Sequence, residues 1–305
     1  MSEIERQPER RAHPEVQRTG SVRQIEQAMR PAVHSVRRAL QYAALSVLHP
    51  KELAFYRKAI AGAYLPNELI DVVPAVRVLY VAVPKAACTR IRSILAASVA
   101  RDTISNWQRD TNWLVHDRKV NGLQAPRHSI LDFYNVATDP NALRFSIVRN
   151  PYDRLVSCWA DQYRDRSLGS SDGRIKRYLK YRRAVSEKLP AGAGKTLSFP
   201  EFVQFATATA DRWIDRHWTP QHAILNLAGV QLHFAGKMEN LSEHITRLLD
   251  HVNLPAESRA EFAKPFHNSK RGLMHEYYTA ELADLVYRTY ERDFDTFQYP
   301  RALPS

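Results

Sequence analysis

Cysteine is scarce in this chain of 305 residues, and long apolar segments are absent from it. The two cysteines, Cys88 and Cys158, lie far apart in the sequence and show no metal-ligand spacing. This excludes a disulfide scaffold and a cysteine-based metal centre, and it favours a reducing compartment. No run approaches the roughly 18 apolar residues of a membrane-spanning helix, and the N-terminal MSEIERQPERRAHPE lacks the apolar stretch of a secretory signal. We therefore expect a cytoplasmic protein.

Glycine is also scarce, with 10 residues, and the sequence contains no complete glycine-rich nucleotide loop. The segment AGAGKT at 191–196 resembles the end of a Walker A loop, but Leu189 occupies the position of the required first glycine. A Mg²⁺-dependent kinase or nucleotide-binding enzyme would need that loop and a carboxylate placed for the metal. A kinase or nucleotide-binding enzyme stays open as an alternative function, although the sequence lacks these motifs. We expect no bound metal.

What the sequence has in excess is positive charge. The chain contains 44 Lys and Arg against 32 Asp and Glu, which gives a net charge of +12 and an isoelectric point near 9.8. Such a balance favours an anionic partner, but charge alone does not separate a nucleotide, an acidic glycan and a membrane surface. The segment 164–195 is the most basic, with ten Lys or Arg against three acidic residues. A polyanion-binding module built on this segment is a second alternative, and no nucleic acid is expected as partner.

The pattern along the chain divides it into three parts. Residues 1–21 are polar and charged, which is typical of a disordered arm. Residues 22–74 are predicted to form a helical extension, because apolar side chains recur at helical spacing over 22–48 beside a basic face. This extension packs on the main domain or contacts a membrane surface peripherally. Residues 75–305 form the main domain, which a basic helical insertion at 164–200 interrupts.

Strand and helix patterns alternate in the main domain. Short apolar runs at 76–83, 144–148 and 230–235 predict buried strands. Helical patterns follow at 89–101, 151–163 and 240–252, and a tyrosine-rich helix is predicted over 277–299. Strands that alternate with helices in this way predict an α/β fold with a parallel sheet flanked by helices.

The segment VAVPKAACTRIRSIL at 81–95 predicts a phosphate site. A strand, a tight turn and a helix place unpaired N–H groups and the positive end of a helix dipole at one point. Lys85 and Arg90 add positive charge and Thr89 adds a hydroxyl, while the small Ala86 and Ala87 let a ligand approach the backbone. An ordinary strand-to-helix turn with surface cations is the alternative interpretation.

The segment FSIVRNPYDRLVSCW at 145–159 repeats this design. Arg149 stands at the strand end and Ser157 follows two helical turns later, so that a guanidinium and a hydroxyl can hold one phosphate. Ligands of open parallel sheets bind beyond the carboxyl ends of the strands. The two segments therefore predict two anion sites that hold one nucleotide.

With both segments in view, the chain resembles the carbohydrate sulfotransferases of the heparan 2-O and HNK-1/chondroitin 4-O type. PKAACTRIRSIL is similar to the family's 5'-phosphosulfate loop, RFSIVRNPYDRLVSCWADQY to its 3'-phosphate motif, and FAGKMENLSEHITRLL to its later strand and helix. The resemblance covers roughly residues 75–300 and implies a P-loop-like fold. The absent membrane anchor indicates a bacterial-like member.

The resemblance implies the co-substrate PAPS (3'-phosphoadenosine-5'-phosphosulfate), the product PAP and a carbohydrate or glycolipid acceptor. Lys85 would contact the phosphosulfate and its bridging oxygen, Thr89 and Arg90 the 5'-phosphate, and Arg149 and Ser157 the 3'-phosphate. NSKRG at 268–272 is similar to a segment that closes over the nucleotide. The remaining implied nucleotide-binding residues are Pro84, Ala86, Ala87, Cys88, Lys270 and Arg271.

An in-line displacement on the acceptor hydroxyl needs a base, and histidine suits that role at neutral pH. His128 lies between the two motifs in text that resembles the family's catalytic histidine region. His217, followed by Trp218, resembles an acceptor-binding segment, so it is the second candidate, and Asp132 is an acidic alternative. In the basic insertion, Arg174, Arg177 and their neighbours are predicted to bind the acceptor, and their positive charge favours an acidic one.

Overall fold

The computed structural model describes residues 43–99, 123, 130–185, 196–212, 215–264 and 274–304. Two compact units divide the chain, Met1–Lys51 and Glu52–Ser305. In the first unit residues 43–48 are helical, and helix α2 (Pro50–Ala61) begins at its end. No helix in the described ranges is long and apolar enough to cross a membrane. The predicted arm at 1–21 and most of the 22–48 helix lie outside the described residues.

A four-stranded sheet forms the centre of the second unit. Its order is β1 (Ile70–Val73), β2 (Val78–Val81), β3 (Leu143–Val148) and β4 (Phe234–Lys237). β1 pairs antiparallel with β2, and the other pairs are parallel, with Val81 opposite Ser146 and Ser146 opposite Ala235. Every residue of β1 and β2 is buried, which explains the continuous apolar run of β2, while the one charged residue of β1, Asp71, pairs with Arg92. The predicted α/β class with a mainly parallel sheet is confirmed.

Two strand predictions differ from the structure. The third strand was predicted at 230–235, but β4 begins only at Phe234. The sheet also starts earlier than residue 75, because β1 lies within the segment predicted as a helical extension. A short 3₁₀ helix, η1 (Pro74–Val76), turns the chain from β1 into β2.

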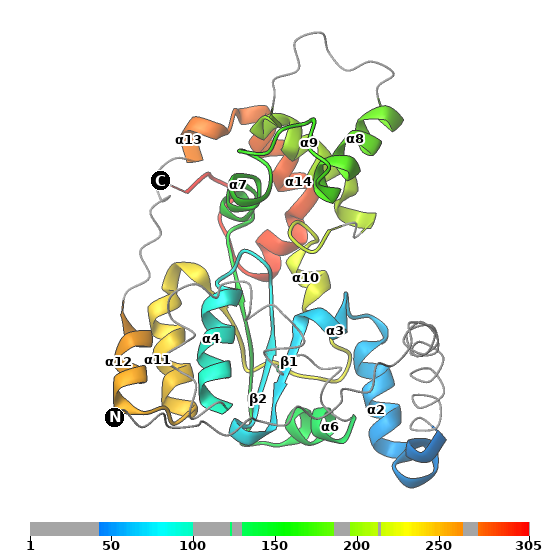
Figure 1. Cartoon of the computed structure of the whole chain (residues 1–305), viewed down its shortest axis with the longest axis vertical. Coiled ribbons are helices and arrows are strands. Elements are labelled where there is room, and N and C mark those ends of the chain that lie inside the picture. The colour runs from blue at the N-terminus through cyan, green and yellow to red at the C-terminus, as the bar shows by residue number, and fades with distance from the viewer. Residues whose placement is uncertain are drawn as a thin grey trace, which may run out of the picture. The chain divides into compact units, whose positions relative to one another are not determined.

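Each parallel strand is followed by a helix, as predicted. α4 (Cys88–Val99) follows β2, α7 (Pro151–Gln162) follows β3, and α11 (Leu241–His251) follows β4 through η5 (Met238–Asn240). α7 starts sharply because Pro151 occupies its first position and the Asn150 side chain accepts a hydrogen bond from the Tyr152 N–H. Figure 1 shows α4, α11 and α12 (Ala256–Ala263) on one side of the strands.

The remaining helices surround α7 or border the sheet. α6 (Ile130–Thr138) packs on β1 and β2, and α3 (Pro66–Leu69) leads into β1. α14 (Ala280–Thr296) packs on α7, α9 (Phe199–Thr209) and α10 (Gln221–Ile224). The helix predicted over 277–299 is α14, which begins at Ala280 and ends at Thr296, and the short α13 (Met274–Tyr277) precedes it.

The segment predicted as a basic insertion contains a helix, α8 (Gly173–Val185). An isolated bridge joins Ser167 to Thr196, so the chain leaves and returns at one place. α9 begins soon after this bridge, where the Glu201 carboxylate accepts hydrogen bonds from the Ser198 N–H (3.1 Å) and hydroxyl (2.6 Å). This arrangement stabilises the start of α9, and a second 3₁₀ helix, η4 (Ala210–Arg212), follows α9.

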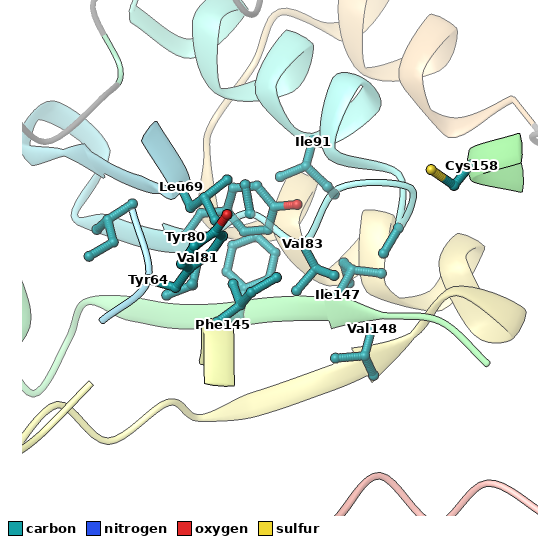
Figure 2. Close-up of a cluster of buried hydrophobic side chains, with 14 of the residues drawn as sticks. Tyr64, Leu69, Tyr80, Val81, Val83, Ile91, Phe145, Ile147, Val148 and Cys158 are labelled. Carbon is teal, nitrogen blue, oxygen red and sulfur yellow. The ribbon is translucent and has the colours of Figure 1, made fainter. Parts of the chain in front are cut away.

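The core holds the sheet and α4 together. The rings of Tyr80 and Phe145 lie 5.0 Å apart across β2 and β3, and Phe234 of β4 stacks on Phe145 at 5.3 Å. Figure 2 shows Ile91 of α4 beside these strands. Because the strands pack against α4 on this side, the loop between β2 and α4 is held at both of its ends.

Candidate active site

The loop between β2 and α4, which the sequence predicts as a phosphate site, has an unusual backbone. Lys85 (φ 71°) and Ala87 (φ 58°) adopt left-handed backbone conformations, and Ala86 between them is fully buried. Such conformations are unfavourable for residues with a Cβ and are found preferentially at functional sites. α4 then begins at Cys88, which places Thr89 and Arg90 in its first turn. The first turn of a helix offers N–H groups to an anion.

Lys85 points across to α7. Its ammonium group forms an ion pair with Asp161 in the last turn of α7, and the Lys85 side chain is 15% exposed. Burial alone would raise the pKa of Asp161, but the hydrogen bond and charge of Lys85 lower it. The Asp161 carboxylate therefore stays ionised and holds the lysine beside α7.

Arg149 reaches the same loop from the end of β3. Its guanidinium donates a hydrogen bond to the Lys85 carbonyl oxygen (3.2 Å) and lies 3.8 Å from the Asp153 carboxylate. Ser157 is half-buried two turns along α7. The structure thus brings the two predicted anion-binding segments together at one edge of the sheet.

The backbone of Arg149 is held as firmly as its side chain. Its N–H donates to the Gln221 side-chain oxygen (2.9 Å), and the Gln221 amide donates to its carbonyl (2.8 Å). Asp293 of α14 is fully buried and accepts hydrogen bonds from the N–H groups of Gln221 (2.7 Å) and His222 (2.8 Å). The C-terminal helix therefore fixes the turn that carries Arg149.

His217 forms a carboxylate-oriented pair near Lys85. Its Nδ1 lies 2.6 Å from Asp215 Oδ1, and Asp215 Oδ2 accepts a hydrogen bond from Arg177 of α8 (2.7 Å). Burial lowers the pKa of His217, partly offset by Asp215, and the nearby charge of Lys85 lowers it further. The imidazole is therefore neutral near pH 7, and its Nε2 has no hydrogen-bond partner among the described residues. Neutral imidazole with an oriented Nδ1–H is suited to accept a proton at Nε2.

Two other arginines predicted as site residues form hydrogen bonds within the protein. Arg90 donates to the carbonyl oxygens of Phe262 (2.6 Å) and Lys264 (3.1 Å) at the end of α12. Arg174 bonds Asp172 (2.8 Å) and also Gln162 beside Asp161. These arginines border the loop and α7, respectively.

Trp218 belongs to the core. It is 1% exposed, its indole N–H donates to the Thr209 hydroxyl (3.0 Å), and Phe205 lies 5.2 Å from its ring. It therefore holds the His217 segment against α9 and does not line the site.

The two cysteines lie within the predicted motifs. Cys88 begins α4, and Cys158, which is labelled in Figure 2, follows Ser157 on α7. Burial raises the pKa of Cys158 to about 12, so this thiol stays protonated. The predicted His128, Lys270 and Arg271 lie outside the described residues. Asp132 lies in the first turn of α6, which packs on β1 and β2.

Sequence reasoning missed Asp161, Asp215 and Arg154. Asp215 stands two positions before His217, a spacing that was a visible signal for a carboxylate partner. Arg154 and Asp161 share one face of α7, at helical spacing with Ser157. In the described ranges, no group of three His, Cys, Asp or Glu side chains forms a potential metal site.

Comparisons with known proteins agree with this architecture. A family model described as the sulfotransferase family matches residues 69–300, and the chain belongs to that family. The chain is 25% identical to human carbohydrate sulfotransferase 14, over 73% of this chain and 58% of the relative. It is 24% identical to mouse carbohydrate sulfotransferase 8, over 74% of this chain and 55% of the relative. The chain thus spans about half the length of the curated relatives it matches, and no solved structure matches it significantly.

Proposed function

We propose that this chain transfers a sulfuryl group from PAPS to a hydroxyl of a carbohydrate. The observation that carries the proposal is the meeting of Lys85, Arg149 and His217, which come from three separate segments. Lys85 and Arg149 are joined through the Lys85 carbonyl (3.2 Å), and the charge of Lys85 acts on His217. Cationic groups and a neutral base thus share one site.

The residues present fit the two anionic ends of PAPS. The left-handed loop, the first turn of α4 and Lys85 form one cationic end of the site. Arg149 and Ser157 form the other, and the Arg149 guanidinium is only 8% exposed. A buried guanidinium gains most from a phosphate, because a bidentate charged contact offsets the loss of hydration. Thr89 in the first turn of α4 adds a hydroxyl to the first end.

When bound, PAPS supplies the activated sulfuryl group. Lys85 stabilises the negative charge that grows on the leaving oxygen, which lowers the barrier because this interaction is stronger in the transition state. His217 takes the proton of the acceptor hydroxyl at Nε2. Asp215 holds the opposite ring nitrogen and stabilises the imidazolium that forms. His128 stays an alternative base on sequence grounds.

A carbohydrate acceptor is supported by the names of the relatives, which are carbohydrate sulfotransferases. The basic helix α8 supports an acidic acceptor, because its Arg177 reaches Asp215 beside the base. Lys176 and Lys180 on the same helix are exposed. Cations at the rim of a site raise the local concentration of an anionic substrate.

A thermal-shift comparison tests the nucleotide assignment. PAP is expected to raise the melting temperature much more than ADP, since ADP lacks the 3'-phosphate that Arg149 and Ser157 hold. Equal shifts would contradict the two-ended site. Transfer of ³⁵S from labelled PAPS to a panel of polysaccharides, glycolipids and simple alcohols then identifies the acceptor. If the protein binds PAP but transfers ³⁵S to none of these acceptors, the proposal of a carbohydrate acceptor is contradicted.

A further inference from the structure

Arg154 of α7 is a buried cation bound by carbonyl groups. The residue is 2% exposed, and its guanidinium donates three hydrogen bonds. Nε donates to the Pro84 carbonyl (3.1 Å), Nη1 to that of Thr219 (2.7 Å) and Nη2 to that of Arg216 (3.0 Å). It forms no ion pair with a carboxylate in the part of the chain that the structure describes.

The three acceptors belong to two separate segments. Pro84 precedes Lys85 in the phosphate loop, while Arg216 and Thr219 enclose His217 in the sequence. A guanidinium is planar, and its donors point in fixed directions. One rigid group on α7 is therefore bonded next to both proposed functional residues.

From these contacts we infer that Arg154 is a positioning residue that sets Lys85 relative to His217. This inference rests on the proposed function of the site. Arg149 also joins the loop to Gln221, but through its side chain on one side and its backbone on the other, whereas the single rigid guanidinium of Arg154 bonds both segments. If it is lost, the loop and the residues that flank His217 lose a shared rigid contact and can shift relative to each other. Misplacement of reacting groups by about 1 Å costs on the order of a hundredfold in rate.

Arg92 provides a matched control. It is also a buried arginine, 4% exposed, but it lies on α4 and pairs with the buried Asp71 (2.7 Å). Arg92→Lys removes the same planar group as Arg154→Lys and keeps the charge. Its hydrogen bonds to Asp71 and to the Glu68 carbonyl join α4 to β1 and α3, away from the Pro84 and His217 segments.

The first measurement is turnover in a double-mutant cycle. Arg154→Lys is expected to lower kcat about a hundredfold, with acceptor KM nearly unchanged, because lysine offers no planar fork. In a Lys85→Ala background the same change is expected to cost less than about tenfold, since the position of Lys85 no longer matters. Arg92→Lys is expected to lower the melting temperature and leave kcat within about threefold. Equal losses in both backgrounds, or a normal kcat in Arg154→Lys, would overturn the inference.

The second measurement does not depend on activity. Backbone hydrogen exchange is expected to speed up in Arg154→Lys at both 82–87 and 215–222, and in Arg92→Lys at neither. Faster exchange in only one segment, or in none, would show that Arg154 does not couple them, even if the chain turns over no PAPS. Arg154→Gln, which keeps an amide donor, replaces Arg154→Lys if the lysine variant does not fold.

Discussion

Two buried arginines of this molecule are held in different ways. Arg92 of α4 donates to both carboxylate oxygens of Asp71, at 2.7 and 3.3 Å, and to the Glu68 carbonyl (2.7 Å). Arg154 of α7 donates to three carbonyls. Burial alone would lower the pKa of either group; Asp71 raises that of Arg92, whereas that of Arg154 is lowered.

The difference separates a structural region from a functional one. The Arg92–Asp71 pair neutralises itself, so it joins α4 to β1 without adding a net charge. Carbonyl dipoles hold Arg154 in place next to the phosphate loop, and in the described ranges no carboxylate pairs with it directly. A site for an anionic nucleotide benefits from a cation without a direct carboxylate partner, whereas a core contact does not.

Breaking the structural pair is expected to have the largest effect. Arg92→Leu leaves the Asp71 carboxylate buried without its cation, which is expected to cost about 3–5 kcal/mol in the free energy of unfolding. Urea unfolding measures it. The double variant Arg92→Leu/Asp71→Leu is the control, and it is expected to recover most of the loss. A cost below about 1 kcal/mol for the single variant would show that the Arg92–Asp71 pair is not a structural contact of the kind contrasted with Arg154.

Arg149 is expected to behave as a site residue. Arg149→Ala is expected to weaken PAP binding by about 2–3 kcal/mol, because a charge-assisted contact with phosphate is lost. Isothermal titration calorimetry gives the affinity. ADP provides the control ligand, since its affinity is expected to change little. An equal loss for both nucleotides would remove Arg149 from the 3'-phosphate site.

A substitution at Asp215 tests whether the Asp215–His217 pair takes part in catalysis. Asp215→Asn is expected to lower kcat about 30-fold, since the orienting carboxylate of a base contributes within the usual range of general-base catalysis. The carboxylate raises the pKa of His217, so its removal lowers that pKa. The acid limb of the kcat–pH profile is therefore expected to move to lower pH.

The exposed Asp211 of η4 supplies the control, and Asp211→Asn is expected to leave both kcat and the profile unchanged. An acid limb of Asp215→Asn that stays in place would identify another residue as the base.

The smallest effect is expected on α8. Lys176→Ser/Lys180→Ser removes two exposed charges and is expected to raise KM for an acidic glycan about two- to threefold at low salt, and hardly at all at high salt. Steady-state kinetics at two salt concentrations measures this. Arg57→Ser/Lys58→Ser on α2 removes the same charge elsewhere and is expected to change nothing. A rise that salt does not reduce would argue against an electrostatic role.

The local features of the fold could be predicted from the sequence. Strands β2 and β3 and helices α4 and α7 were predicted from apolar runs and helical spacing, which act over a few residues. Lys85 and Arg149 followed from the rule that ligands bind beyond the carboxyl ends of parallel strands. Their placement at one edge of the sheet needed no knowledge of distant contacts.

Tertiary contacts decided what lies beyond that range. β4 begins four residues later than predicted, and its Gly236 has the His244 ring so close that a Cβ would lie 2.6 Å from it. No local pattern specifies such a contact between a strand and the following helix.

The partners of the site side chains were decided in the same way. The sequence by itself determined the residues that bear charge and the strand ends that carry them. Only the folded chain brought Asp161 to Lys85 and the carbonyls of two segments to Arg154. A guanidinium bonds backbone oxygens whatever their side chains are, so no residue pattern announces its partners.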